Sequence, residues 1–86
     1  MASEQSVRQI KNNFSYHPPK GDQQQRYETI RTSARELAST IDNLVPDSRE
    51  KSLAMTNLEQ AVMWANASIA RNEYQVNGET VHKESA

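Results

Sequence analysis

The residues of this chain that could do chemistry gather in one short stretch, FSYHPPKGDQQQRYETIR, residues 14–31. Tyr16 and His17 carry aromatic rings, and aromatic faces can stack on nucleobases. Lys20, Arg26 and Arg31 follow in the same stretch, and their cations can pair with phosphate. A stiff segment that places aromatic rings beside basic groups therefore predicts a binding site for a small nucleotide.

A structural role is the alternative for the same rings, and composition alone favours it. Phe14 and Tyr16 would then only pin the N-terminal arm onto the rest of the chain. An enzyme has little support, because the sequence has no Cys, no glycine-rich phosphate loop and no HExxH motif. Asp47 and Glu50 have the spacing of a helix cap rather than of a catalytic pair. We therefore expect a binding protein with no catalytic residue and no cofactor.

Length and composition narrow the class of protein further. A chain of 86 residues makes one small domain with a marginal core. It has no Cys for disulfides or a zinc site, and its two His lie too far apart in sequence to suggest a metal site. Oligomerisation is therefore the remaining way to stabilise so small a domain. No apolar run nears the roughly 20 residues of a membrane span, and the N-terminus lacks the apolar core of a signal peptide. We expect a soluble, intracellular protein, and its net charge of −1 argues against DNA binding.

The elements that must position this stretch are helices. Residues 4–13 are predicted to form a short helix, after which Pro18 and Pro19 force an extended connection. Two long helices are predicted over residues 23–44 and 48–72, with Asp22 and Asp47 as their N-caps and Gln25 and Glu50 as the capping-box partners. The apolar residues of both long helices repeat at alternating intervals of three and four. The short VPD connection between them predicts an antiparallel hairpin.

The predicted fold is therefore all-α: an N-terminal arm over residues 1–13, a helical hairpin over 14–74 and a flexible polar tail over 75–86. The apolar face of the helix at 48–72 is wider than one neighbouring helix can cover, which predicts a helical homo-oligomer. Trp64 either anchors that interface or packs under the N-terminal helix. For Arg49 and Lys51 an intersubunit salt bridge is the default, and a phosphate is the alternative. The predicted interface residues are Met55, Leu58, Val62, Trp64 and Ile69.

The same residues carry a resemblance to a known family. FSYHPPKGDQQQRYETIR, followed by PDSREKSLAMTNLEQAVMWANASIARNE, resembles the small phage proteins called anti-CBASS cyclic-oligonucleotide sponges. These share a hairpin domain with phage inhibitors of the Thoeris defence system. The resemblance covers residues from about Asn13 to Glu73, and it implies a non-enzymatic protein in the cytoplasm of the infected bacterium. Such proteins form homohexamers, as trimers of dimers, and sequester the cyclic di- and trinucleotides that activate CBASS defence.

The resemblance also implies roles for individual residues. Tyr16 would stack on a base of a cyclic dinucleotide in a pocket between two protomers. Arg31 would hold phosphate, although relatives carry Lys where this sequence has Arg, and the two cations differ in hydrogen-bond geometry. A separate threefold site for cyclic trinucleotides would use Arg71 together with Ser33 or Thr32.

Two other functions stay open. The first is a helical adaptor that binds a host protein, which predicts a large apolar patch left exposed after self-assembly. The second is a sponge for cyclic ADP-ribose isomers, and it ranks lower because the Thoeris inhibitors that bind those signals are longer chains. The sequence does not rank the cyclic dinucleotides against one another.

Overall fold

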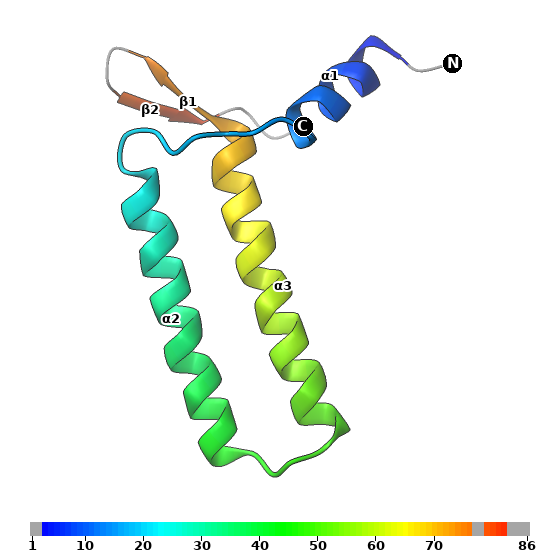
Figure 1. The fold of residues 1–86 in the computed structure, drawn as a ribbon, viewed down its shortest axis with the longest axis vertical. Coiled ribbons are helices and arrows are strands. Elements are labelled where there is room, and N and C mark those ends of the chain that lie inside the picture. The colour runs from blue at the N-terminus through cyan, green and yellow to red at the C-terminus, as the bar shows by residue number, and fades with distance from the viewer. Residues whose placement is uncertain (1–2, 77–78, 83–86) are drawn as a thin grey trace.

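The computed structural model of the chain describes residues 3–76 and 79–82. Three helices follow one another in this part of the chain: α1 (Glu4–Asn13), α2 (Gln23–Leu44) and α3 (Arg49–Asn72). Helices α2 and α3 run antiparallel, joined at one end by residues 45–48, and α1 projects from the other end (Figure 1). The predicted short helix and long hairpin are confirmed, and α3 begins one residue later than predicted. Assembly into an oligomer stays a prediction.

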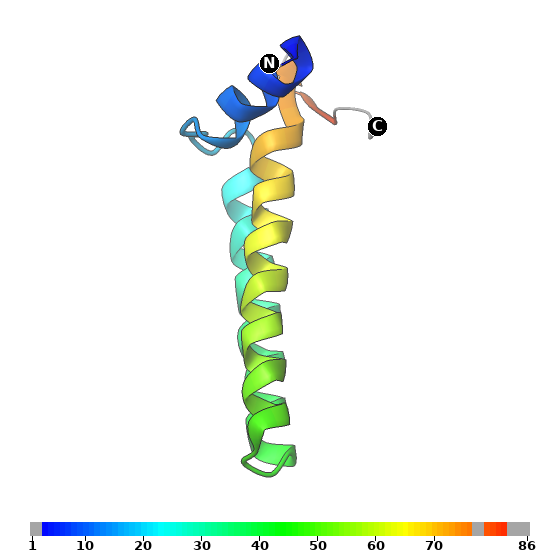
Figure 2. The ribbon, with the colours of Figure 1, turned by 90° about the vertical axis from the view of Figure 1, so that its right-hand side faces the viewer.

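The two long helices meet along the apolar seam that the sequence spacing predicts. Ala34, Leu58 and Val62 line two shallow grooves, one on each side of this seam, with volumes of about 300 and 210 Å³. Small side chains such as Ala61 and Ala65 leave these grooves unfilled. Seen edge-on, the hairpin is one thin layer (Figure 2), so a single pair of helices cannot enclose its own apolar residues.

The result is a chain that buries no apolar side chain among its described residues. Its radius of gyration is 16.7 Å, whereas a compact domain of this length has about 12 Å. The only buried residues in that part of the chain are polar, Gln23 and Glu73. Within the single chain, stability therefore comes from the seam and from this buried polar pair.

The start of α2 differs from the predicted capping box. Asp22 occupies the N-cap position but makes no side-chain cap hydrogen bond. Its carboxylate pairs instead with Arg26, at 3.1 Å. Gln23 takes over at this end: its Oε1 accepts a hydrogen bond from the Lys20 backbone N–H at 2.9 Å, and Gly21 turns the chain with a φ of 55°. The predicted Asp22–Gln25 box is therefore wrong, because a stronger charge partner lies one turn along the helix.

The N-cap of α3 also lies one residue later than predicted. Ser48, not Asp47, is the N-cap, and its hydroxyl accepts from the Lys51 backbone N–H at 3.1 Å. Asp47 pairs with the Lys51 ammonium at 2.8 Å, and Asp42 pairs with it at 3.0 Å. The hydrogen bond with Asp47 comes first among the contacts that raise the pKa of Lys51, and the same bond lowers the pKa of Asp47. Lys51 thus has two carboxylate partners within its own chain, and an intersubunit salt bridge stays a prediction. Arg49 has no ion pair among the described residues.

The chain beyond α3 corrects the all-α prediction. Strands β1 (Glu73–Val76) and β2 (Glu79–His82) pair antiparallel, with Glu73 opposite His82 and Val76 opposite Glu79. The flexible polar tail predicted over 75–86 is therefore wrong for residues 75–76 and 79–82, and the rest of it lies outside the described residues. The signal was present in the sequence: an Asn-Gly dipeptide between runs of β-formers is the strongest short hairpin signal.

Candidate functional site

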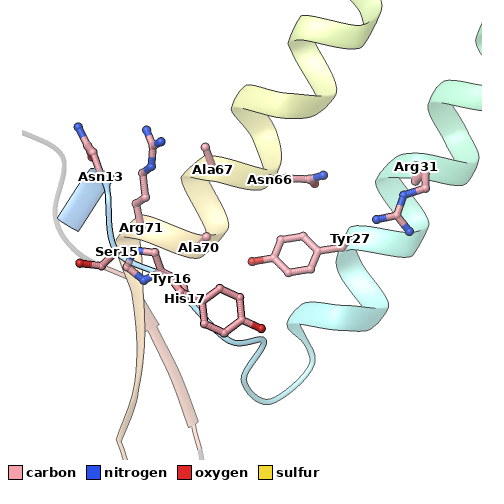
Figure 3. A pocket seen from close by; sticks show the side chains of 10 residues that line it. All are labelled: Asn13, Ser15, Tyr16, His17, Tyr27, Arg31, Asn66, Ala67, Ala70 and Arg71. Atoms are coloured by element: carbon pink, nitrogen blue, oxygen red, sulfur yellow. The ribbon is translucent and has the colours of Figure 1, made fainter. Parts of the chain in front are cut away.

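One cavity lies at the end of the hairpin where α1 joins it. It has a volume of about 400 Å³, is open to solvent, and is bounded by the segment after α1, by α2 and by α3 (Figure 3). Ligand pockets commonly have about 300–1,000 Å³, so the cavity can hold a nucleotide-sized group. Its walls are formed by Asn13, Ser15, Tyr16, His17, Tyr27, Arg31, Asn66, Ala67, Ala70 and Arg71.

Polar contacts hold the segment after α1 in place. The Asn12 side-chain amide donates to the Arg71 carbonyl at 3.0 Å, which ties the end of α1 to the end of α3. His17 Nε2 lies 2.7 Å from the Asn12 carbonyl oxygen and donates to it. Pro18 then keeps the next residues extended. Phe14 is 86% exposed, so the prediction that Phe14 and Tyr16 pin the arm is wrong for the single chain: hydrogen bonds do this, and the rings stay uncovered.

Two tyrosines line the cavity from different elements. Tyr16 comes from the extended segment and is 85% exposed, so its ring has both faces available. Tyr27 comes from α2 and is half-buried; burial raises the pKa of its phenol, and the nearby Glu73 carboxylate raises it further. Tyr27 therefore stays neutral near pH 7, and the pair offers flat apolar surface of the kind on which bases stack.

Two arginines lie on opposite walls of the cavity. Arg31 comes from α2, and Arg71 comes from the last turn of α3 (Figure 3). Neither forms an ion pair with a carboxylate in the part of the chain that the structure describes. An unpaired guanidinium at a cavity wall can bind a phosphate through two parallel hydrogen bonds. The cavity therefore combines exposed aromatic faces with positive charge.

Arg26 and Lys20, also predicted as site residues, do not line this cavity. The Arg26 guanidinium forms a two-pronged pair with Glu73, with Nη1 to Oε2 at 2.9 Å and Nη2 to Oε1 at 2.6 Å. Gln23 Nε2 donates to the same carboxylate at 3.1 Å. The bonds from Arg26 come first among the causes that lower the pKa of Glu73 to about 2, and Glu73 in turn raises the pKa of Arg26 further above its usual value. Arg26 thus joins α2 to β1.

Comparison with known proteins shows which family the chain belongs to. The family model described as Acb2/Tad1, hairpin domain, matches residues 6–70, which is about three quarters of the chain. The chain belongs to the Acb2/Tad1 hairpin family. No curated protein and no solved structure gives a significant match to the chain.

The Acb2/Tad1 hairpin family is the family of anti-CBASS and anti-Thoeris sponges, so the predicted resemblance is confirmed. Membership implies a phage sponge for cyclic nucleotide signals. The matched range covers most of α1, the extended segment, α2 and most of α3. Nearly every element that builds the cavity thus falls inside the hairpin domain.

The hairpin places the predicted dinucleotide residues Tyr16, His17 and Arg31 on one cavity. It does not bring Arg71 together with the predicted trinucleotide hydroxyls in one chain. Thr32 and Ser33 line a separate depression on α2 of about 320 Å³, while Arg71 lines the cavity beside Tyr16. A trinucleotide site built from these residues would have to form between copies of the chain.

The predicted interface residues fall into two groups. Met55, Leu58 and Val62 line the seam grooves, and Ile69 is half-buried. Trp64 is different, because it is 65% exposed, and the alternative that it packs under the N-terminal helix is wrong in this chain. Met63 beside it is equally exposed, which leaves an apolar patch on the outer face of α3.

Six residues that line the cavity were not predicted as site residues, and Tyr27 and Asn66 are two of them. Tyr27 fits the heptad spacing, which assigned it to the seam. Asn66 lies on a run of small residues in α3, and no motif distinguishes it from a solvent-facing polar residue.

Among residues 3–76 and 79–82, no group of three or more His, Asp or Glu could hold a metal ion. No helix in the same ranges is long and apolar enough to cross a membrane.

Proposed function

We propose that this protein is a non-enzymatic sponge that binds cyclic dinucleotides in the Tyr16 cavity and so blocks CBASS defence. The observation that carries the proposal is the cavity itself: an uncovered tyrosine faces a space of about 400 Å³ that has an unpaired Arg31 on its wall. Tyr16 would stack on a base, and Arg31 would bind a phosphate. His17 completes the wall next to Tyr16 and is held by Asn12.

A second copy of the chain would close the site. The cavity is open to solvent, and the chain has uncovered apolar surface to contribute, including Trp64 and Met63, which are both 65% exposed. Both features support self-association, and a homohexamer built as a trimer of dimers is the assembly that the family resemblance implies. Two copies of Tyr16 could then stack on the two bases of one ligand. Cyclic trinucleotides would bind where Arg71 and Ser33 or Thr32 of three copies converge.

Isothermal titration with purine cyclic dinucleotides, with the oligomer mass measured in the same buffer, tests this function. We expect tight binding at about one ligand per two chains. Tyr16→Ala should reduce affinity by about tenfold or more, since base–aromatic stacking contributes roughly 1–3 kcal/mol per base, and it should leave the oligomer mass unchanged. Tyr74→Ala, which alters an exposed tyrosine on β1, is the matched control.

Recovery of the ligand separates a sponge from an enzyme. Heat-denatured complex should release the cyclic dinucleotide intact, as judged by chromatography against the untreated compound. A linear product would contradict the proposal, and so would wild-type affinity in Tyr16→Ala.

The exposed apolar patch favours one other function, a helical adaptor that binds a host protein through Met63 and Trp64. Its distinguishing result is an assembled protein that binds no cyclic nucleotide and still exposes Trp64, measured by tryptophan fluorescence quenching. A buried Trp64 in the assembled protein would exclude this use of the patch.

A further inference from the structure

One buried polar atom on the cavity wall has no hydrogen-bond partner in the described chain. Asn66 projects from α3 into the space between the two long helices, towards Tyr27 and Arg31 (Figure 3). Its Oδ1 is buried and accepts no hydrogen bond. The other such atom among the described residues, Arg26 Nε, belongs to a guanidinium that already binds Glu73 through both terminal nitrogens. The Asn66 amide oxygen is therefore the buried acceptor on the cavity wall that is left without a hydrogen bond.

An unused amide at a cavity wall calls for a physical explanation. Most buried polar atoms in proteins have a hydrogen-bond partner, because a buried acceptor without one costs the desolvation of that group. Alanine or leucine would avoid this cost at a helical position, and both neighbours of Asn66, Ala65 and Ala67, are alanines. The amide has no hydrogen bond that rotation of its side chain would break, so its oxygen can turn into the cavity when a donor arrives there.

The surroundings of Asn66 suit a flat ring. Tyr27 stands across from it on α2, and Ala67 and Ala70 contribute only methyl groups to the wall beside it (Figure 3). An aromatic face and small side chains leave a slot that a planar base can enter edge-first. The edge of that base would then meet the Asn66 amide.

We propose that Asn66 is a specificity-determining residue that reads the edge of an adenine base; this inference rests on the proposed function. An amide offers one acceptor and one donor side by side, which matches the N6 amino group and N7 of adenine. The same edge of guanine offers two acceptors, O6 and N7, which suits arginine instead. The Asn66 oxygen accepts from the adenine amino group, and its nitrogen donates to N7.

Two ligands that differ at position 6 of the purine test this role. Cyclic di-AMP carries the amino group, and cyclic di-IMP carries an oxygen there. A bidentate amide contact discriminates by about 1–3 kcal/mol, so wild-type protein should prefer cyclic di-AMP by roughly 5- to 150-fold in isothermal titration. Asn66→Leu, which keeps the branched shape and removes both polar atoms, should weaken cyclic di-AMP binding by about that factor and change cyclic di-IMP binding little. The preference between the two should collapse.

A control substitution and a stability measurement distinguish the loss of base recognition from a change in the folded structure. Asn57→Ala alters an exposed asparagine on the same helix and should leave both affinities unchanged. Asn66→Leu should melt no lower than wild type, because it removes a buried oxygen that has no partner.

The outcomes separate the two proposals. Equal losses for both ligands in Asn66→Leu, or a preference that survives the substitution, would overturn the role of Asn66 while leaving the sponge intact. Wild-type protein that binds neither cyclic purine dinucleotide would overturn the proposed function itself.

Discussion

Replacing Glu73 by Gln should break the ion pair with Arg26 that joins the start of α2 to β1. The Glu73 side chain is only 4% exposed, and its carboxylate binds both terminal nitrogens of Arg26 and the Gln23 amide. Glutamine keeps the size and one acceptor but loses the charge. Folded protein would then hold Arg26 without a full counter-charge.

The size of the effect follows from the pKa of Glu73. The contacts lower this pKa from an ordinary value of 4.5 to about 2, and each pH unit of difference corresponds to about 1.4 kcal/mol. The full difference corresponds to roughly 3 kcal/mol of stability at neutral pH. Because the Arg26 side chain is 32% exposed and water screens it, we expect Glu73→Gln to lower the free energy of unfolding by about 2 kcal/mol at pH 7.

The pH dependence gives the sharper test. A carboxylate whose pKa is lowered on folding adds stability above its ordinary pKa, and this stability is lost as the pH falls from about 4.5 towards 2. Urea unfolding followed by circular dichroism, at fixed protein concentration, should therefore show wild type and Glu73→Gln converging as the pH approaches 2. Glu79→Gln, an exposed glutamate on β2, is the control and should follow wild type. Equal stability of Glu73→Gln and wild type at pH 7, or a gap that persists at pH 2, would refute the argument.

Five further substitutions test other features of the chain. Ser48→Ala should cost about 1 kcal/mol of unfolding free energy by removing the N-cap, and Asp47→Ala should cost clearly less; the reverse order in urea unfolding would restore Asp47 as the cap. Gly21→Ala should cost roughly 1–2 kcal/mol, because an L-residue is strained at a φ of 55°, and an unchanged melting temperature would contradict this. Trp64→Glu should reduce the oligomer mass in sedimentation, whereas an unchanged mass would place Trp64 outside the interface. Arg71→Glu should weaken cyclic trinucleotide binding more than dinucleotide binding in titration, since Arg71 also lines the Tyr16 cavity, whereas equal losses would argue against a separate site.

The helix boundaries could be predicted because the spacing of the apolar residues and the positions of the prolines indicate the same boundaries. Alternating intervals of three and four, bounded by Pro18, Pro19 and Pro46, give the same helix boundaries as the structure to within one residue. The choice of cap was less predictable. Asp22 and Asp47 are both good caps in isolation, yet each lies four residues before a cation, Arg26 or Lys51, that binds its carboxylate instead.

The site was predictable only in part, because its residues are joined by contacts between distant segments. Tyr16, His17 and Arg31 belong to one continuous stretch, which made them visible as a group. Arg26 belongs to the same stretch, but its role depends on Glu73, 47 residues away in sequence. The role of Asn66 depends on having no partner, and this property exists only once α2 and α3 have come together.

The absence of buried apolar side chains in the described chain has a consequence for how the protein works inside a cell. Where a folded chain gains stability from other copies or from ligand, the folded fraction depends on their concentrations. Any molecule that binds the folded form and not the unfolded form then raises the folded fraction. Dilute, freshly translated chains would be the least stable and the most open to proteolysis. In the proposed assembly, a rising concentration of the cyclic nucleotide would then increase the fraction of chains that are assembled and able to bind it.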